Sequence, residues 1–276
     1  MNYSEKAEVL IEAIPYILKF RGKIFVLKIG GTLIENEEVI GQIAKDIVML
    51  SLVSIKVIVV CGGGKEISDV MKKFGMEPKF YNGLRITDEK TMEIVEMVLA
   101  GNLRGRIVSR ICSEGGKAIG LTGRDFNFLI AEKIDKLGMV GRIVNVNKEP
   151  MLKLLDMELI PVISPITIVQ NPDGTYTALN TNADEVASKI ALSLEAEKLI
   201  FLTDQPGVLD KDGKVIQTIK IDKIPESIAG GMLPKIESAM EVAKTGKKVH
   251  ILSGLQKHSI LLEIFTKEGV GTEIVS

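Results

Sequence analysis

The sequence is poor in the residues from which many functional sites are built. Its 276 residues include no tryptophan, only two cysteines and only two histidines. Cys61 and Cys112 are too few for a disulfide framework, and neither belongs to the C-x-x-C pair typical of zinc and redox sites. We therefore expect a reducing compartment, the cytoplasm, and no metal centre held by the protein itself.

An excess of charge of either sign is also missing. The net charge is -1, with 26% charged and 46% apolar residues, so we expect a globular protein without a surface for nucleic acid. No uncharged run approaches the length of a membrane span, and Glu5, Glu8 and Glu12 interrupt the apolar residues of the first segment. These features favour one large domain or two lobes, with no membrane partner.

The two commonest phosphate-binding fingerprints are absent as well. A P-loop needs G-x-x-x-x-G-K-[ST], but no Gly-Lys pair in this chain is followed by Ser or Thr. In the segment VIVVCGGGKEI, residues 57–67, Ile67 stands where the dinucleotide pattern requires its third glycine. A nucleotide would therefore have to be held by another arrangement of glycines.

Short β-branched runs alternate with amphipathic stretches along most of the chain. This alternation is typical of a parallel sheet covered by helices. Asn82-Gly83 and Asp173-Gly174 are hairpin signals, and we place the boundary between two lobes just after the second, at 175–180. The predicted strands are 24–28, 57–61, 118–121, 159–163, 199–203 and 249–252, and the clearest predicted helices are 38–53, 88–100, 183–195 and 233–245.

Glycines or polar residues follow three of these strands, at the strand ends where such folds bind ligands. Glycine turns allow backbone N–H groups to approach an anion, and a lysine beside one of them adds a positive charge. Each turn taken alone is equally well explained as a tight connection from a strand to a helix, but the pair favours an anion site. The segments are Lys28-Ile29-Gly30-Gly31, Gly62-Gly63-Gly64 and Thr203-Asp204.

Three further polar features have both a functional and a structural interpretation. Arg85, beside the first hairpin, suits bidentate capture of a carboxylate, although a solvated arginine would explain it as well. Asn180, Asn182 and Asp184 alternate into a helix start, where capping explains one of them but not all three. Lys235, one turn into a helix, would by default be a surface lysine.

In chain order, these segments resemble the amino-acid kinase family over nearly the whole chain, from about residue 5 to 276. Within that family the resemblance is to members that phosphorylate the γ-carboxylate of N-acetyl-L-glutamate in arginine biosynthesis. Its most specific parts are the Gly-Leu-Arg-x-Thr-Asp and Asn-x-Asn-Ala-Asp segments. The matching segments are Lys28-x-Gly30-Gly31, Gly62-Gly63-Gly64, Gly83-Leu84-Arg85-x-Thr87-Asp88, Asn180-x-Asn182-x-Asp184, Thr203-Asp204-x-x-Gly207 and Gly230-Gly231-Met232-x-x-Lys235.

This resemblance implies an α/β fold, a three-layer αβα sandwich with a mostly parallel central sheet. Residues 21–178 would form the lobe that binds N-acetyl-L-glutamate, and residues 179–276 the lobe that binds ATP with its Mg²⁺. The implied site residues are Lys28, Lys235 and Asp184 for catalysis; Gly63, Gly64, Arg85 and Asn180 for the substrate; Gly30, Gly31 and Gly62 for the phosphates; and Thr203, Asp204 and Met232 for the nucleotide.

The chemistry of this reaction explains these residue types. A carboxylate acceptor is ionised at neutral pH, so no general base is needed and neither His250 nor His258 has to be catalytic. Two lysines would neutralise the phosphoryl oxygens, while glycine amides hold the developing charge. The sequence departs from the family at Cys61, where His is common, and at Ile29; we interpret Cys61 as tolerated rather than nucleophilic.

Other members of the fold remain as alternatives. A sister kinase could act on aminoadipate or glutamate carried by a protein, which a basic docking surface would favour. Carbamate and aspartate kinases fit less well, because of the Gly83-Leu84-Arg85 and Asn180-to-Asp184 segments. A protein that senses arginine without catalysis is the alternative from another class, and the intact Lys28, Asp184 and Lys235 argue against it.

The segment before the first strand predicts a helix, residues 1–20, with an apolar stripe at Leu10, Ile11, Ile14, Ile17 and Leu18. The stripe either packs on its own lobe or meets another subunit, and Pro15 should kink the helix. In arginine-inhibited members of the family, a similar helix links dimers into a hexamer, a trimer of dimers. The resemblance therefore implies L-arginine as an inhibitor, bound near Tyr16, His250, Glu263, Gly269 and Gly271.

Overall fold

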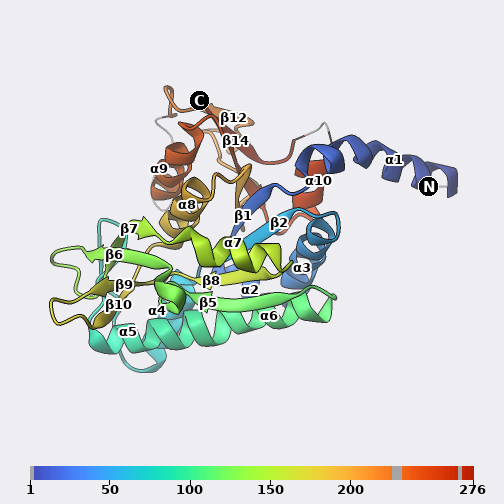
Figure 1. Cartoon of the computed structure of the whole chain (residues 1–276). Helices are drawn as coiled ribbons and strands as arrows, with labels where there is room; N and C mark the ends of the chain where they lie inside the picture. Colours follow the sequence, from blue (N-terminus) through green and yellow to red (C-terminus); the bar gives the residue numbers. More distant parts are fainter. Residues whose placement is uncertain (1–2, 226–231, 267–268) are drawn as a thin grey trace.

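The computed structural model describes residues 3–225, 232–266 and 269–276. Its centre is an eight-stranded sheet in the order β12-β14-β13-β11-β1-β2-β8-β5 (Figure 1). Neighbouring strands run parallel except β13 and β14, as the mostly parallel sheet of the prediction requires. The strands are β1 (Ile24–Ile29), β2 (Lys56–Cys61), β5 (Ala118–Thr122), β8 (Ile160–Ser164), β11 (Lys198–Thr203), β12 (Thr218–Lys220), β13 (Lys248–Ser253) and β14 (Thr272–Val275).

Helices cover both faces of this sheet and complete the three predicted layers. Side chains alternate along each strand, so Phe25 and Leu27 of β1 enter one core while Val26 enters the other. The first core is closed by α2 (Gly31–Glu35), α3 (Glu37–Leu52), α4 (Gly64–Lys73), α5 (Glu89–Glu96), α6 (Arg104–Ser113) and α10 (Ser259–Phe265). The second is closed by α7 (Lys148–Asp156), α8 (Ala183–Ser193) and α9 (Met232–Ala243).

A second, four-stranded sheet was not among the predicted elements, apart from one hairpin. It has the order β10-β9-β6-β7 and lies at one end of the molecule, on the left in Figure 1. The Asp173-Gly174 signal correctly marked the turn between β9 (Ile166–Gln170) and β10 (Tyr176–Asn180), and the other strands are β6 (Leu129–Lys133) and β7 (Gly141–Val146). The proposed lobe boundary at 178/179 falls within β10, and the division into a substrate lobe and an ATP lobe stays a prediction.

The hairpin signal at Asn82-Gly83 is confirmed by β3 (Phe80–Tyr81) and β4 (Leu84–Arg85), with Gly83 at φ +78°. The predicted helix 88–100 begins as expected, because the Asp88 side chain accepts a hydrogen bond from the Thr91 N–H at 2.8 Å. It does not end near residue 100, however. It continues through a π-helix, η1 (Met97–Leu103), directly into α6, and such π-turns occur frequently at functional sites.

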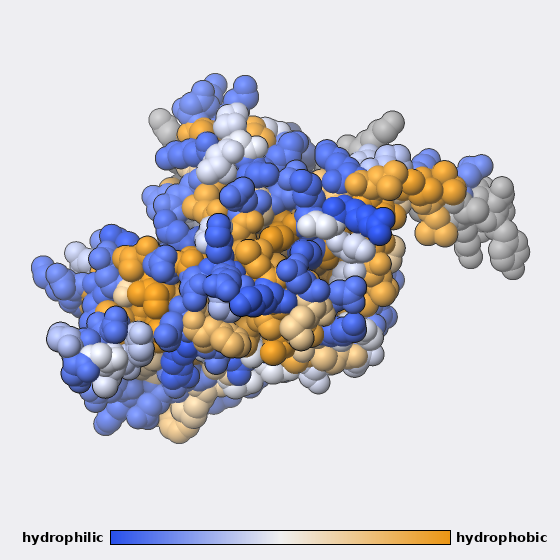
Figure 2. Space-filling model, viewed as in Figure 1, coloured by the Kyte–Doolittle hydropathy of each residue, from blue (hydrophilic) through white to orange (hydrophobic). Residues whose placement is uncertain are grey.

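The predicted N-terminal helix forms as α1 (Tyr3–Phe20), with Pro15 inside it, and projects from the body of the protein (Figure 1). Leu10, Ile11, Ile14 and Leu18 are 43 to 68% exposed, and Figure 2 shows apolar side chains along this projection. The alternative in which these four pack on their own lobe is therefore wrong. The kink at Pro15 stays a prediction. Within the described residues, no helix combines the length and apolar character needed to cross a membrane.

Candidate functional site

The candidate site lies where three neighbouring strands end at the same edge of the main sheet. β1 runs between β2 and β11, and all three point the same way. The Gly62 N–H donates to the Ile29 carbonyl at 2.8 Å, and the Gly30 N–H donates to the Leu202 carbonyl at 3.2 Å. Backbone hydrogen bonds thus join the strand ends that carry the glycine turns predicted from the sequence.

A buried ion cluster occupies this edge. Asp184, in the first turn of α8, accepts hydrogen bonds from Lys235 Nζ through both carboxylate oxygens at 2.9 Å. Its Oδ1 also lies 3.0 Å from Lys28 Nζ at the end of β1. Lys235 is not a surface lysine, because it is only 7% exposed and lies 5.0 Å from the Phe201 ring centroid. Three segments far apart in sequence therefore meet at one carboxylate.

The cluster has one positive charge in excess, and this governs its titration. Burial by itself would raise the pKa of Asp184, but the charges of Lys28 and Lys235 lower that pKa to about 2. Burial and the like charge of Lys28 outweigh the attraction of Asp184 and lower the pKa of Lys235 to about 8. An anion that reaches this cluster would relieve the repulsion between the lysines, so the site is suited to phosphoryl oxygens.

Close packing leaves little room for a side chain at Gly62 or Gly63. A Cβ on Gly62 would lie 3.1 Å from Lys28 Nζ, and one on Gly63 would lie 2.8 Å from a methyl carbon of Leu99 in the π-helix. Gly64 faces open space and begins α4, whose N-terminus has no side-chain cap. The first N–H groups of this helix therefore remain available to an anion.

Arg85 lies beside this turn rather than in solvent. It is 7% exposed, and its guanidinium donates to the Gly64 carbonyl at 2.5 Å and to Ser68 Oγ at 2.8 Å. Its guanidinium carbon lies 4.7 Å from the Phe80 ring centroid, and burial lowers its pKa. The contacts to α4 hold the planar guanidinium group of Arg85 at the rim of a cavity. Other N–H groups of this guanidinium remain available to donate to a ligand.

The cavity beside the cluster has a volume of about 230 Å³ and is lined by Lys28, all three glycines of the Gly62–Gly64 turn, Arg85, Asn180 and Asp184. Asn180 is oriented by its own contact, since its Nδ2 donates to Thr87 Oγ1 at 3.2 Å. Asn182 caps α8 and also lines the cavity. The sequence hypothesis thus brought together residues that share one cavity, though their individual roles stay predictions.

Two of the three residues predicted for the nucleotide, Thr203 and Asp204, lie at the neighbouring strand end, that of β11. Thr203 ends β11, and its hydroxyl lies 3.3 Å from Asp204 Oδ1. Met232 begins α9, three residues before Lys235. Gly230 and Gly231, also part of the matching pattern, lie outside the described residues. Among the described side chains, no group of three His, Cys, Asp or Glu residues is suited to hold a metal ion.

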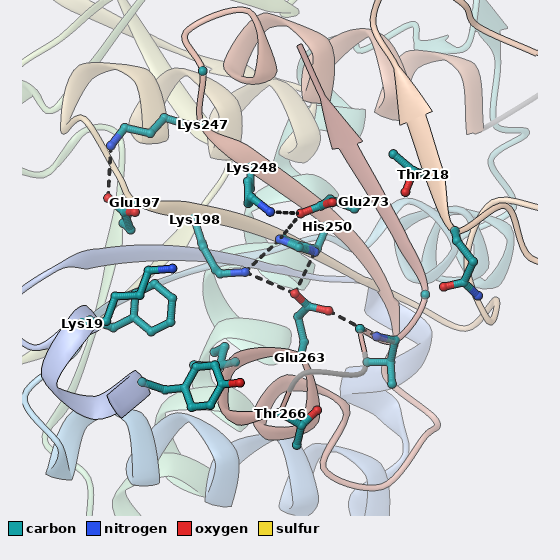
Figure 3. Close-up of a pocket in the computed structure, with 18 of the residues that line it drawn as sticks. Lys19, Glu197, Lys198, Thr218, Lys247, Lys248, His250, Glu263, Thr266 and Glu273 are labelled. Carbon is teal, nitrogen blue, oxygen red and sulfur yellow. Dashed lines mark hydrogen bonds and ion pairs between the residues drawn. The ribbon is translucent and has the colours of Figure 1, made fainter. Parts of the chain in front are cut away.

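A second cavity, of about 730 Å³, lies at the base of α1 (Figure 3). Its lining includes all five residues that the resemblance assigned to arginine, namely Tyr16, His250, Glu263, Gly269 and Gly271. Lys198 Nζ lies 2.9 Å from His250 Nε2 and 3.2 Å from Glu263 Oε1, and the other His250 nitrogen lies 3.0 Å from the same carboxylate oxygen. Figure 3 shows these three side chains directed toward one another.

Burial dominates the electrostatics of this second cavity. It lowers the pKa of His250 to about 2, with help from the charges of Lys198 and Lys248, so His250 is neutral at physiological pH. Burial also lowers the pKa of Lys198, against the opposing effect of Glu263. The group therefore balances one lysine against one carboxylate. Sequence reasoning missed Lys198, since a lysine before an apolar strand gives no signal of burial.

The remaining histidine pairs outside the candidate active site. His258 Nδ1 lies 2.6 Å from the buried Asp46 of α3. Cys61, at the end of β2, is fully buried, and burial raises its pKa to about 11. Its sulfur lies 3.6 Å from Ser164 Oγ, which in turn donates to the Leu99 carbonyl of the π-helix at 2.9 Å. This protonated thiol matches its interpretation as a packing residue.

An αβα sandwich with a lysine–carboxylate–lysine cluster beside a glycine turn is suited to a kinase of small molecules, because phosphoryl transfer depends on positioning and charge stabilisation. The chain belongs to the amino acid kinase family, which it matches over residues 23–253.

Among its relatives, it is 47% identical to the acetylglutamate kinase of Aquifex aeolicus, over 98% of this chain and 97% of that protein. It is 48% identical to the acetylglutamate kinase of Kosmotoga olearia, again over 98% and 97% of the two chains. Among solved structures, the N-acetylglutamate synthase of Neisseria gonorrhoeae, in complex with coenzyme A and L-arginine, superposes with a TM-score of 0.87 at 28% identity. The match covers 98% of this chain but only 65% of that synthase chain.

Proposed function

We propose that this protein transfers the γ-phosphoryl group of ATP to the γ-carboxylate of N-acetyl-L-glutamate, an early step of arginine biosynthesis in the cytoplasm. The observation that carries the proposal is the cluster of Lys28, Asp184 and Lys235 beside the cavity that Arg85 and Asn180 line. The full-length similarity to acetylglutamate kinases supports the choice of substrate.

In the proposed reaction, a substrate carboxylate oxygen attacks the γ-phosphorus, the bond to the β-phosphate oxygen breaks, and an acyl phosphate and ADP result. No proton has to be removed, so the main task is to bring negative groups together. Lys28 and Lys235 neutralise the transferred phosphoryl group, and Asp184 holds both in place. Arg85 binds the α-carboxylate and Asn180 the acetamido group.

Mg²⁺ is proposed to arrive with the nucleotide. Both oxygens of Asp184 are already engaged by lysines, and the described residues offer no cluster of acidic side chains for a resident ion. This donor set fits an ion that keeps waters and nucleotide phosphates as its ligands. The ion would neutralise part of the negative charge of the phosphates, and Thr203, at the end of β11, and the adjacent Asp204 would bind the nucleotide that carries it.

A coupled assay of ADP release tests the function. ADP should form at a substantial rate only when N-acetyl-L-glutamate is present, and hydroxylamine should trap the acyl phosphate. Aspartate, carbamate and carrier-bound aminoadipate or glutamate serve as competing acceptors. A higher kcat/KM for any of these would contradict the proposal. A protein that binds arginine but forms no ADP with any acceptor would support the non-catalytic sensor instead.

We also propose that the second cavity binds L-arginine as a feedback inhibitor. An arginine ligand needs a carboxylate for its guanidinium, and Glu263 is held at the cavity wall by Lys198, His250 and the Val270 N–H. Lys19 also lines the cavity and offers a charge for the ligand carboxylate, whereas Lys247 and Lys248 in the same lining pair with Glu197 and Glu273. Tyr16 and Phe20 bring the base of α1 into the same wall, so a ligand here can bias the position of that helix.

The exposed stripe of α1 leads to a proposal about assembly. Leu10, Ile11, Ile14 and Leu18 present apolar area that a monomer would leave in water. A second copy of the helix would cover it, and linking dimers in this way would give a hexamer built as a trimer of dimers. Deleting residues 1–20 should leave an active dimer that arginine no longer inhibits. Light scattering and the kinase assay decide the matter, since an arginine-sensitive hexamer without α1 would refute this role.

A further inference from the structure

Glu66 is a buried carboxyl group to which the reaction proposed above assigns no role. It lies in the first turn of α4, two residues after Gly64, and is only 4% exposed. Its Oε1 is buried and accepts no hydrogen bond from the described residues. Burial raises its pKa, and the charges of Glu35 and Asp69 raise it further. A buried polar group without a partner destabilises a fold, so stability alone does not account for this side chain.

The carboxyl group of Glu66 lies between the two glycine turns of the active site. A Cβ on Gly31, at the start of α2, would overlap its Oε2 and carboxyl carbon. A Cβ on Gly63, in the other turn, would lie 3.7 Å from the same Oε2. Gly31 has ordinary helical backbone geometry, so the obstacle to a side chain there is the carboxyl group of Glu66. The carboxyl group of Glu66 therefore fills space between the two turns, beside the hydrogen bond from the Gly62 N–H to the Ile29 carbonyl that joins their bases.

We propose that Glu66 is a positioning residue for phosphoryl transfer, whose carboxyl group acts as a spacer that sets the separation of the Gly30-Gly31 turn from the Gly62–Gly64 turn. The inference rests on the proposed function. In that function Gly30, Gly31 and Gly62 hold the phosphates of the donor, and Gly63 and Gly64 hold the acceptor. In-line transfer requires reacting atoms about 3–3.5 Å apart, and an error of about 1 Å can cost about 100-fold in rate.

A double-mutant cycle of Gly31→Ala and Glu66→Ala tests the spacer. Gly31→Ala alone should lower kcat by about tenfold or more, because its methyl group displaces the carboxyl of Glu66 and moves one turn. In the Glu66→Ala background the same methyl group fills the vacated space, so Gly31→Ala should cost less than about threefold. An equal loss in both backgrounds would overturn the proposal, since Gly31 would then be needed by a ligand rather than by Glu66.

The shape of the residue is tested separately from its charge. Glu66→Gln keeps the size of the side chain and should keep kcat within about threefold, whereas Glu66→Ala should lower kcat by about tenfold with a smaller change in KM for N-acetyl-L-glutamate. Asp69→Asn, an exposed acid on the same helix, is the matched control. A loss in Glu66→Gln as large as that in Glu66→Ala would refute a spacer. If the wild type lacks kinase activity, the proposed function fails, while the same cycle read in melting temperatures still tests the Gly31 contact.

Discussion

The two buried clusters of this protein use the same residue types with different charge balance. At the sheet edge, Lys28 and Lys235 share one carboxylate, so one positive charge is left over. In the cavity at the base of α1, Lys198 faces Glu263 and a neutral His250, so the charges within this group of three side chains cancel. The first arrangement is prepared for an anion such as a phosphoryl group. The second is prepared for a ligand that carries both charges, as a free amino acid does.

In the functions proposed above, this difference would also separate catalysis from regulation. A catalytic cation stabilises the negative charge that develops during a reaction more strongly when no carboxylate of the protein already neutralises it. A group that only recognises a ligand can be fully paired beforehand and can exchange partners when the ligand binds. Substitutions in one cluster at a time test this comparison.

The largest expected effect comes from the excess charge of the first cluster. Lys28→Ala and Lys235→Ala should each lower kcat by about 100- to 1,000-fold, because each removes charge stabilisation from the transition state. Lys198→Met, which removes the buried lysine of the second cluster, should keep kcat within about threefold. Steady-state kinetics and melting temperatures of all three variants check this. Near-normal turnover of either active-site variant would exclude that lysine from the mechanism.

Substitutions in the second cluster should change inhibition by arginine rather than kcat. Glu263→Gln removes the carboxylate proposed for the guanidinium, and it should raise the arginine concentration for half inhibition by about tenfold or more, with kcat almost unchanged. Inhibition curves at fixed substrate concentrations measure the effect. Thr245→Ala, elsewhere in the lining, is the control. Unchanged inhibition in Glu263→Gln would place the arginine site elsewhere.

Substrate recognition beside the first cluster should depend on the planar guanidinium of Arg85. Arg85→Lys keeps the charge but loses the fork that contacts Gly64 and Ser68. We expect KM for N-acetyl-L-glutamate to rise by about tenfold and KM for ATP to rise much less. Equal increases in both KM values would move Arg85 out of the substrate pocket.

The two clusters should also differ in pH dependence. Lys235, with a pKa of about 8, loses its proton as the pH rises, so kcat/KM for ATP should fall above pH 8, by about tenfold per unit at the limit. This loss is not unfolding. A pKa below the ordinary lysine value means that the folded state binds fewer protons than the unfolded state, so the contribution of Lys235 to the free energy of unfolding rises from pH 8 toward 10.5. His250, with a pKa of about 2, stays neutral and should cause no step in arginine inhibition between pH 6 and 8.

The smallest effect on kcat is expected from substitution of Cys61, the residue before the Gly62–Gly64 turn. Cys61→Ser keeps a donor toward Leu99 and Ser164, so kcat should stay within about threefold. Thiol reagents should label the exposed Cys112 and leave the buried Cys61 unmodified in the folded protein. A severe loss in Cys61→Ser would mean that the sulfur itself takes part in the reaction.

Much of the scaffold was predictable because its signals are local. The six predicted strands all form, since β-branched runs between helical patterns can bury both faces only in a covered parallel sheet. The capping of α5 by Asp88 and the hairpin at Asn82-Gly83 also follow from neighbouring residues. The π-helix and the four-stranded sheet were missed, because an extra residue in a turn and the pairing of β6 with β9 depend on distant partners.

The sequence by itself determined the fold class, six strands of the main sheet and the residue types available for chemistry. Hydrophobic periodicity and turn residues act over a few neighbouring positions, so they can be recognised without coordinates. Only the tertiary structure decided that Lys235 is buried, that one carboxylate serves both Lys28 and Lys235, and that Lys198 neutralises Glu263. Burial and electrostatic pairing arise between residues far apart in the chain. Whether a lysine is a solvated surface group or a buried cation with a lowered pKa therefore depends on the residues that pack around it.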